Sequence, residues 1–219
     1  MPQVFSPTAN TLSKVSLVLV VFLVAGGLCA LDLIHKSPYV RYTGVPRSQP
    51  VPFSHKHHTN MGIDCRYCHT SVEESHFANV PGTHVCMNCH NQLFTQADLL
   101  APVRESWETG IPIKWVRVND LPDHVQFNHA IHVNKGIGCT TCHGPVGEMP
   151  LMWRHEPLFM KWCLECHREP ERFIRPREEV FNPHYEPPRD QLTLGRQLVE
   201  EYQVPVSDHR LTDCWICHR

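Results

Sequence analysis

The stretch "FNHAIHVNKGIGCTTCH", Phe127 to His143, decides the fold because its pattern recurs along the chain. It ends in two cysteines, two residues apart, that are followed at once by a histidine. This CxxCH pattern occurs five times and uses ten of the eleven cysteines. A lone CxxC is often half of a zinc site or a redox pair. The five motifs, first to fifth, are Cys65/Cys68/His69, Cys86/Cys89/His90, Cys139/Cys142/His143, Cys163/Cys166/His167 and Cys214/Cys217/His218.

The histidine after the second cysteine of each motif distinguishes a haem attachment site from a zinc site or a disulfide scaffold. A zinc site or a disulfide scaffold does not need it, whereas a covalently attached haem does. The two thiols add across the vinyl groups of the haem, and the adjacent imidazole then lies beneath the iron. The motifs therefore predict five covalently bound haem c groups on these ten cysteines. The predicted proximal iron ligands are His69, His90, His143, His167 and His218.

An internal repeat explains the surplus histidines. Residues 53–75, "FSHKHHTNMGIDCRYCHTSVEES", align without gaps on residues 127–149 at an offset of 74. His55 and His58 match His129 and His132. Because positions three apart share one face of a helical turn, each pair points one way, whereas His57 matches an isoleucine and is expected at the surface. The haem motifs thus form two pairs and one single motif.

The F-x-H-x-x-H pattern before CxxCH resembles class III multihaem cytochromes c. The resemblance implies that His55 completes the haem of His69 and that His129 completes the haem of His143. It also implies that His58 and His132 serve two other irons.

Four outer histidines leave one of the five irons without a second ligand. Met149, which takes the place of Ser75 in the second repeat, is the predicted ligand because methionine is a known axial ligand of haem. The alternative for Met149 is ordinary packing against a haem face. Its rivals as a ligand are Met152, Met160, His76, His84, His155, His184 and His209.

Residues 15–31, "VSLVLVVFLVAGGLCAL", carry no charge and are long enough, with their flanks, to cross a bilayer. The alternative is a cleaved export signal; we expect a retained anchor, with Cys29 as an apolar filler rather than a lipidation site. The basic residues around the span do not favour an external C-terminus. Haem attachment decides the orientation, because it occurs outside the cytoplasmic membrane and so places residues 35–219 on the periplasmic side.

The expected fold is a multihaem cytochrome c of short helices and coil wrapped around five covalent haems, with little sheet and one N-terminal transmembrane helix. Prolines interrupt most periodic patterns, although residues 190–202 could form an amphipathic helix. Phe53, Phe127, Trp115 and Trp162 are expected to pack on haem rings. The chain divides into a cytoplasmic N-terminus at 1–14, a transmembrane anchor at 15–34, an extended tether at 35–52 and a pentahaem domain at 53–219, with haem pairs at 53–90 and 127–167 and the fifth haem at 214–218.

Charge and ligand number narrow the function. A net charge of −2 with scattered basic residues argues against a nucleic-acid partner. Haems within one small domain must lie close together, which suits electron transfer. An enzyme with an open iron is the alternative, but all five motifs end in histidine and the candidate outer ligands exceed five. We therefore expect an electron-transfer subunit of an oxidoreductase complex that is not catalytic alone.

The anchor, the blocks "FSHKHH…GIDCRYCHTSVEES…CMNCH" and "KWCLECHREPERFIRP", and the terminal "LTDCWICHR" together resemble the pentahaem cytochrome c subunit of alternative complex III, a quinol:electron-acceptor oxidoreductase. The resemblance implies iron–sulfur and polytopic quinol-binding subunits as partners, and a cytochrome c or a terminal oxidase as the electron acceptor. Two rivals stay open: a stand-alone membrane quinol dehydrogenase that feeds a periplasmic reductase, and a free redox shuttle.

Overall fold

The computed structural model describes residues 6–218, except for the side chains of Pro7, Asp208 and His209. The chain forms two compact units, residues 1–43 and residues 44–219. The first unit contains α1 (Pro7–Lys36) and the single turn α2 (Pro38–Arg41). Proline at the start of α1 suits a first helical position, and Pro38 disfavours helical backbone at Ser37, where α1 ends.

Helix α1 carries apolar side chains all round its surface, and they are exposed; Leu17, for example, is 66% exposed and Phe22 is 72% exposed. Residues 8–36 are long and apolar enough to cross a membrane. A helix whose apolar side chains are exposed all round needs another apolar medium around it. Helix α1 therefore fits a membrane anchor or a signal sequence, and the span expected at 15–34 lies within it.

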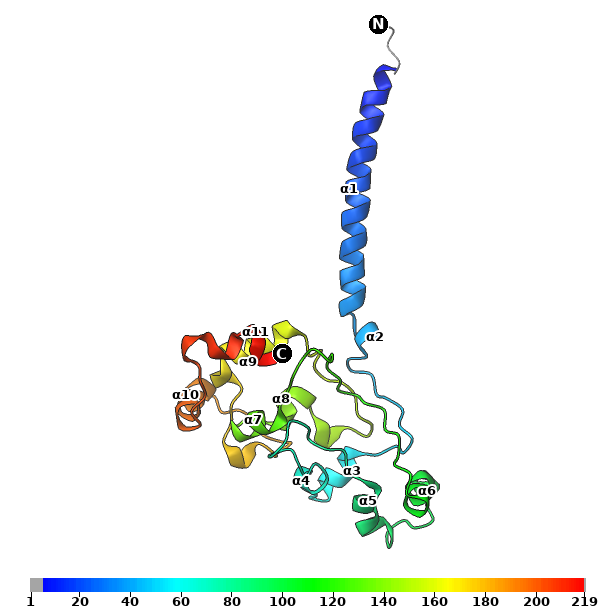
Figure 1. Ribbon diagram of the computed structural model, residues 1–219, viewed down its shortest axis with the longest axis vertical. Helices are drawn as coiled ribbons and strands as arrows, with labels where there is room; N and C mark the ends of the chain where they lie inside the picture. Colours follow the sequence, from blue (N-terminus) through cyan, green and yellow to red (C-terminus); the bar gives the residue numbers. More distant parts are fainter. Residues whose placement is uncertain (1–5, 219) are drawn as a thin grey trace. The chain divides into compact units, whose positions relative to one another are not determined.

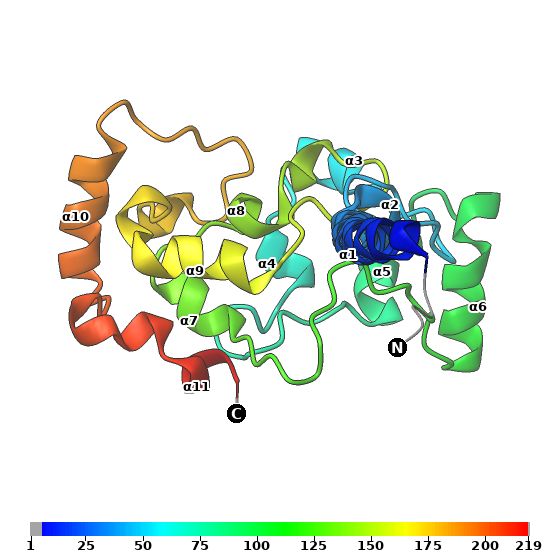
Figure 2. The ribbon, with the colours of Figure 1, turned by 90° about the horizontal axis from the view of Figure 1, so that it is seen from above.

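The second unit is helical, and within residues 44–218 we find no β-strand, only one isolated antiparallel bridge between Ile137 and Ile174. The expectation of short helices, coil and little sheet is confirmed for these residues, as Figures 1 and 2 show. The helices of the second unit are α3 (His55–Asn60), α4 (Cys65–Cys68), α5 (Thr83–His90), α6 (Ala101–Thr109), α7 (His129–Asn134), α8 (Cys139–His143), α9 (Met160–Arg168), α10 (Gln191–Glu201) and α11 (Cys214–Cys217). Its 3-10 turns are η1 (Asp98–Leu100), η2 (Val146–Glu148), η3 (Pro170–Arg172), η4 (Arg177–Glu179) and η5 (Ser207–Thr212).

The second half of the expected tether packs into the haem-motif unit instead of standing free. Gln49 exchanges two hydrogen bonds of 2.9 Å with the backbone of Val116, and the amide of Arg47 donates to the carbonyl of Met152 at 3.1 Å. Val51 is only 4% exposed. These contacts make residues 44–52 part of the second unit, and residues 37–43 connect it to α1 along the chain.

The apolar core of the second unit consists of two small clusters. Val72, Val133 and Val180 form one of them, between the two repeats. Ile174, Leu198 and Tyr202 form the other, where α10 packs against η3. Such clusters are small for a unit of this length, and apolar haem faces would supply the additional burial that a stable domain needs.

Helix α10, which the sequence predicts, meets η3 at Gly195, and this close approach gives a stability prediction. A Cβ atom at position 195 would clash with the carbonyl oxygen of Glu171. Gly195→Ala should therefore destabilise the protein by about 1–3 kcal/mol from overpacking, although alanine favours a helix by about 1 kcal/mol. Thermal unfolding followed by far-UV circular dichroism should show a lower Tm. The exposed Thr193→Ala is the matched control, and an unchanged Tm for Gly195→Ala would contradict the packing described.

Candidate haem-binding site

Each CxxCH motif lies on a short helical segment, so its two cysteines, three positions apart, share one face. In the first and fifth motifs the amide of the histidine donates to the carbonyl of the first cysteine at 2.9 Å, which closes the turn. None of the ten motif cysteines forms a disulfide within the described residues. The motif helices are α4, α5, α8, α9 and α11, from the first motif to the fifth.

A hydrogen bond orients four of the five motif histidines in the same way. In each case the Nδ1 atom lies next to a backbone carbonyl oxygen, which can only accept. Nδ1 therefore carries the proton, and Nε2 keeps its lone pair for a metal ion. The Nδ1–oxygen distances are 2.7 Å from His69 to Asn79, 3.2 Å from His90 to Leu93, 2.6 Å from His167 to Leu211 and 3.1 Å from His218 to His124.

The remaining motif histidine, His143 of the third motif, uses a side chain instead. Its Nδ1 atom lies 3.0 Å from the Asn119 amide nitrogen, while the amide oxygen of Asn119 is buried without a partner. Exchanging the two amide atoms lets Nδ1–H donate to that oxygen and leaves no orphaned acceptor. Burial, with a smaller contribution from His129, lowers the pKa of His143 to about 4. The ring is therefore neutral and has a free Nε2.

Three of the predicted outer histidines face a motif histidine. An iron between two imidazoles, with a metal–nitrogen bond of about 2 Å on each side, separates the ring centroids by roughly 6 to 6.5 Å. Each observed pair has this spacing and could hold one iron. The centroid distances are 6.4 Å for His58 and His90, 6.3 Å for His129 and His143, and 6.0 Å for His132 and His167.

The two repeats use these histidines in the same way. His129 faces the next motif along the chain, and His132 faces the motif after that; His58 matches His132 in this respect. Burial and, after it, the neighbouring histidines, His69 first among them, lower the pKa of His55 to about 4. His55 therefore lies near the histidine that the resemblance assigns to it. Its Nδ1 atom is buried without a partner, whereas Nδ1 of His129 donates to the carbonyl of His76 at 2.8 Å.

The phenylalanine at the start of each repeat packs against both outer histidines of that repeat. Phe53 stacks on His58, with centroids 4.4 Å apart, and meets His55 edge-on at 4.9 Å. Phe127 contacts His132 and His129 in the same way, at 4.4 Å and 4.8 Å. Packing of these phenylalanines on haem faces stays a prediction; the observed contacts show that they orient the imidazole rings.

The two repeats bind each other reciprocally. The amide of Ala130 donates to the carbonyl of Ser75 at 3.1 Å, and the equivalent amide of Lys56 donates to the equivalent carbonyl of Met149 at 3.2 Å. Equivalent groups that meet in this way lie on a local two-fold axis. The first and third motifs are therefore neighbours.

Met149 lies on this contact between repeats and is 0% exposed, next to the start of α3. Of its rivals, Met160 is 65% exposed, and the ring of His155 packs against Gly144 beside the third motif. The carbonyl of His76 accepts from His129. The side chain of His209 lies outside the described residues. The ligand role of Met149 stays a prediction.

Hydrogen bonds connect the first three motifs to one another. The Asn88 amide in the second motif donates to the Tyr67 hydroxyl in the first motif at 3.1 Å. The first and third motifs both reach one strip of chain: the Cys65 thiol donates to the carbonyl of Phe181 at 3.8 Å, and the amide of Cys139 donates to the carbonyl of Val180 at 3.3 Å. The first motif therefore lies between the second and the third.

The last two motifs continue the row. Arg175, seven residues after α9, donates from Nη2 to the hydroxyls of Thr140 and Thr141 in the third motif, at 3.1 and 3.3 Å. The fourth and fifth motifs meet where His167 bonds to Leu211, in the turn just before α11. Figures 1 and 2 agree on this row of α5, α4, α8, α9 and α11. The spatial order of the motifs is thus second, first, third, fourth, fifth.

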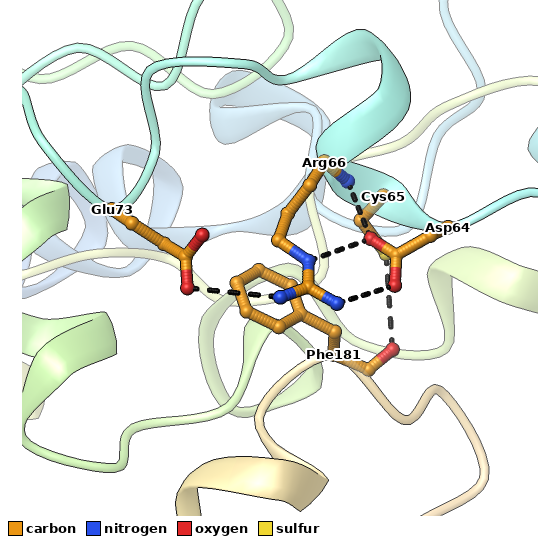
Figure 3. Close-up of polar contacts among 5 residues, drawn as sticks. All are labelled: Asp64, Cys65, Arg66, Glu73 and Phe181. Atoms are coloured by element: carbon orange, nitrogen blue, oxygen red, sulfur yellow. Dashed lines mark hydrogen bonds and ion pairs between the residues drawn. The ribbon is translucent and has the colours of Figure 1, made fainter.

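Figure 3 shows how the start of the first motif is held. Asp64 caps α4 by accepting from the amide of Arg66 at 2.8 Å, and it also accepts two bonds of 2.9 Å from the Arg66 guanidinium. The guanidinium lies 4.5 Å from the centre of the Phe181 ring and 3.8 Å from a carboxylate oxygen of Glu73. This cluster fixes the backbone that carries Cys65.

The hydrogen bonds from Arg66 lower the pKa of Asp64 below its ordinary value. A lowered pKa in the folded state stabilises the protein above the unfolded-state pKa of about 4, and the contribution is lost as the pH falls through the lower folded-state pKa. Asp64→Asn should remove this part of the acid dependence. Because the pair is half-exposed, the effect should be below about 1 kcal/mol at neutral pH.

Asp64→Ala should also lose the cap, for a total of about 1 kcal/mol. The measurement is thermal unfolding of both variants at neutral pH and at pH values below that ordinary aspartate pKa. Identical pH profiles for the wild type and Asp64→Asn would contradict the pairing with Arg66.

The residues present fit covalent haem. Free thiol pairs adjoin imidazoles that have a free Nε2, and opposed imidazoles have the spacing of a shared iron. Arg175 also indicates a bound haem. Its side chain is only 7% exposed, and its Nε and Nη1 atoms have no hydrogen-bond partner. Unsatisfied buried N–H groups are costly, and a haem propionate is a carboxylate that would satisfy them. The Tyr185 ring, 4.4 Å from the guanidinium, has a buried hydroxyl that is likewise without a partner.

One histidine near the fifth motif was not singled out by the sequence analysis. The ring of His124 lies 5.6 Å from the ring of His218, with an angle of 19° between the planes. His124 lies before the second repeat and has no counterpart in the first, so the alignment of repeats carries no signal for it.

Comparisons with known proteins agree with this site. Residues 125–219 match the family described as cytochrome c7 and related cytochrome c. The menaquinone reductase multihaem cytochrome c subunit of Nitratidesulfovibrio vulgaris (strain Hildenborough) is 36% identical over 99 residues, which cover 44% of this chain and 46% of that protein. The chain thus spans about half the length of the curated relative that it matches. The two comparisons support a multihaem cytochrome c that transfers electrons.

Proposed function

We propose that this chain, whose residues 125–219 are similar to cytochrome c7, is a multihaem cytochrome c that carries five haems and relays electrons for a quinone-reacting complex in the membrane. Covalently bound haem supplies reversible one-electron chemistry. The observation that carries the proposal is the spacing of the opposed imidazoles at His90, His143 and His167. Two imidazoles on an iron leave no open position for a substrate, so the chain would transfer electrons rather than catalyse a reaction alone.

The row of motifs supports a linear relay. It begins at the second motif, passes the first, third and fourth, and ends at the fifth. The exposure of the motif cysteines supports the second and fifth motifs as the ends of the relay. Cys89 and Cys214 are exposed, and the other eight motif cysteines are half-buried. Electrons would therefore enter and leave near α5 and α11, which carry the second and fifth motifs.

Helix α1 supports a location at the membrane. In the proposal it anchors the chain in the cytoplasmic membrane, with the haem unit on the periplasmic side, where haem is attached. The resemblance to the pentahaem subunit of alternative complex III favours iron–sulfur and polytopic quinol-binding subunits as partners. Electrons would then pass from quinol to a cytochrome c or a terminal oxidase.

The opposite direction is the second candidate. The relative from Nitratidesulfovibrio vulgaris is named as a subunit of a menaquinone reductase, a name that describes electrons delivered to the quinone. Both candidates use the same anchored relay. They differ in which partner reduces it.

The two directions can be separated on the native complex. The chain should be purified in mild detergent with its partners and then mixed, in separate experiments, with a quinol and with a reduced soluble cytochrome c. Rapid haem reduction by quinol, lost when the chain is stripped of its partners, is the expected result. Reduction by the cytochrome alone would favour the quinone-reducing direction. Equally rapid reduction of the isolated chain by quinol would contradict both and favour a stand-alone quinol dehydrogenase.

A further inference from the structure

We propose that Arg175 and Tyr185 form a carboxylate-binding site, and that this site holds a propionate of a haem attached to a motif next to the third. The inference rests on the proposed function, because it needs the haems of that proposal and assigns a site to one of their side groups. Both residues lie outside every CxxCH motif and outside the two repeats.

The guanidinium of Arg175 is held between the backbone of the third motif and an aromatic ring. Its Cζ atom lies 4.4 Å from the centre of the Tyr185 ring, and its Nη2 atom donates to Thr140 and Thr141. A Cβ atom at Gly138 would clash with the Cζ, Nε and Nη1 atoms of Arg175. Gly138 has a φ of −73°, which any residue adopts, so the close approach requires the glycine and the backbone conformation does not.

Three N–H donors of this cation have no partner. One is on Nε and two are on Nη1, and the Tyr185 hydroxyl is also buried without a partner. The nearby Glu179 does not supply the missing acceptor, because its carboxylate accepts from the Asn182 amide at 2.6 Å and reaches neither nitrogen. A buried cation without an anion is strongly unfavourable, whereas a carboxylate would accept from these donors. The site therefore requires an anion that the chain itself does not supply.

The first repeat shows what a similar cation binds. Asp64 stands at the position of Gly138, and its carboxylate accepts two bonds from the Arg66 guanidinium. Arg66 also lies on an aromatic ring, 4.5 Å from the centre of Phe181. In each repeat an arginine thus packs on an aromatic ring beside the residue that precedes the first cysteine, but only the first repeat provides the carboxylate. The carboxylate for Arg175 would therefore come from a bound group.

The position of Arg175 indicates which haem supplies the propionate. The thioether bonds attach a haem at one edge, and its propionates leave from the opposite edge. Thr140 and Thr141 lie between the two cysteines of the third motif, so Arg175 lies at the thioether edge of that haem and away from its propionates. The propionate would therefore belong to the haem of the first or the fourth motif, the two neighbours of the third. Its binding would fix two adjacent haems relative to each other, and the cation would raise the potential of the haem that carries it.

The test uses the full-length protein, purified from membranes with its haems attached and with its haem number verified by intact mass. Arg175→Gln should shift one propionate bending band in the resonance Raman spectrum and lower the midpoint potential of one haem in a redox titration. Arg175→Lys should restore part of that potential because it keeps the charge, and Tyr185→Phe should move the same band by less.

Arg66→Gln is the matched control. It removes a similar cation beside the first motif, but the carboxylates that pair with Arg66 belong to the chain. This variant should leave every propionate band unchanged, which separates a bound propionate from a general effect of charge.

Two backgrounds identify the haem. One lacks the haem of the first motif, through Cys65→Ser and Cys68→Ser, and the other lacks the haem of the fourth, through Cys163→Ser and Cys166→Ser. The Raman effect of Arg175→Gln should vanish in one of the two. An effect that persists in both backgrounds would overturn the assignment, and so would propionate bands that Arg175→Gln leaves unchanged. Potentials that added acetate shifts in the wild type but not in Arg175→Gln would mean that a soluble carboxylate occupies the site instead. A wild-type mass with fewer than five haems would be a separate failure, of the haem number in the proposed function.

Discussion

Replacing Cys139 and Cys142 with serine is expected to interrupt the relay at its centre. The third motif adjoins the first motif on one side and the fourth on the other, so its haem is the middle one of the row. The variant should lose the mass of one haem, and the haems at one end should no longer be reduced rapidly from the other end. Electron tunnelling falls steeply with distance, so we expect end-to-end transfer to fall by orders of magnitude. The readout is stopped-flow absorbance of the purified complex after mixing with quinol.

The matched control removes a haem from the end of the row. Cys214→Ser with Cys217→Ser also deletes one haem, but it leaves the second, first, third and fourth motifs adjacent. Reduction of the remaining four haems should then stay rapid if electrons enter at the second motif. If electrons enter at the fifth motif instead, the rate of haem reduction should fall in this variant. Reduction should then stay rapid in Cys86→Ser with Cys89→Ser. Undiminished end-to-end transfer in the third-motif variant would contradict the order of motifs described above.

His129→Ala is expected to have the next largest effect. The ring planes of His129 and His143 are within 4° of parallel and their centroids are 6.3 Å apart, which is the smallest interplanar angle of the opposed pairs. Removing one imidazole should leave that iron with five ligands and convert it from low-spin to high-spin. Reorganisation on reduction should then increase, and electron transfer past the third motif should slow. The readouts are electron paramagnetic resonance and the rate of haem reduction in the same sample.

His57→Ala supplies the control, because His57 lies on the other repeat at the position of Ile131 and is exposed. His132→Ala should also produce a high-spin iron, but a different one, since His132 faces His167. The double variant His129→Ala/His132→Ala should therefore show twice the high-spin signal of either single variant. A signal no larger than that of one variant would mean that both histidines serve one iron.

Local pattern accounts for what the sequence could predict. Two cysteines and the histidine that follows them predict a haem attachment site from five residues alone. The repeat at an offset of 74 shows which histidines are equivalent. The helix at 191–201 follows from its own periodicity. The apolar stretch before residue 36 predicts α1 by composition and length alone.

Groups that meet only in the folded chain could not be predicted. His124 lies 94 positions from the histidine that it faces, and no repeat marks it. Asn119 orients His143 from 24 positions away through an amide that has no motif around it. The carbonyls of Asn79, Leu93 and Leu211 carry no sequence signal, because every residue has a carbonyl. The order of the motifs likewise depends on the local two-fold contact between repeats, which places the first motif, not the second, beside the third.

The spin state of the irons tests the central claim most directly, because the claim is that opposed side chains close every iron and leave the chain able only to pass electrons. The measurement is electron paramagnetic resonance of the fully oxidised wild-type protein, with its haem number fixed by intact mass. Five low-spin haems and no high-spin signal is the result that the account predicts. A stoichiometric high-spin haem would contradict it and would indicate an open iron at which a substrate could react.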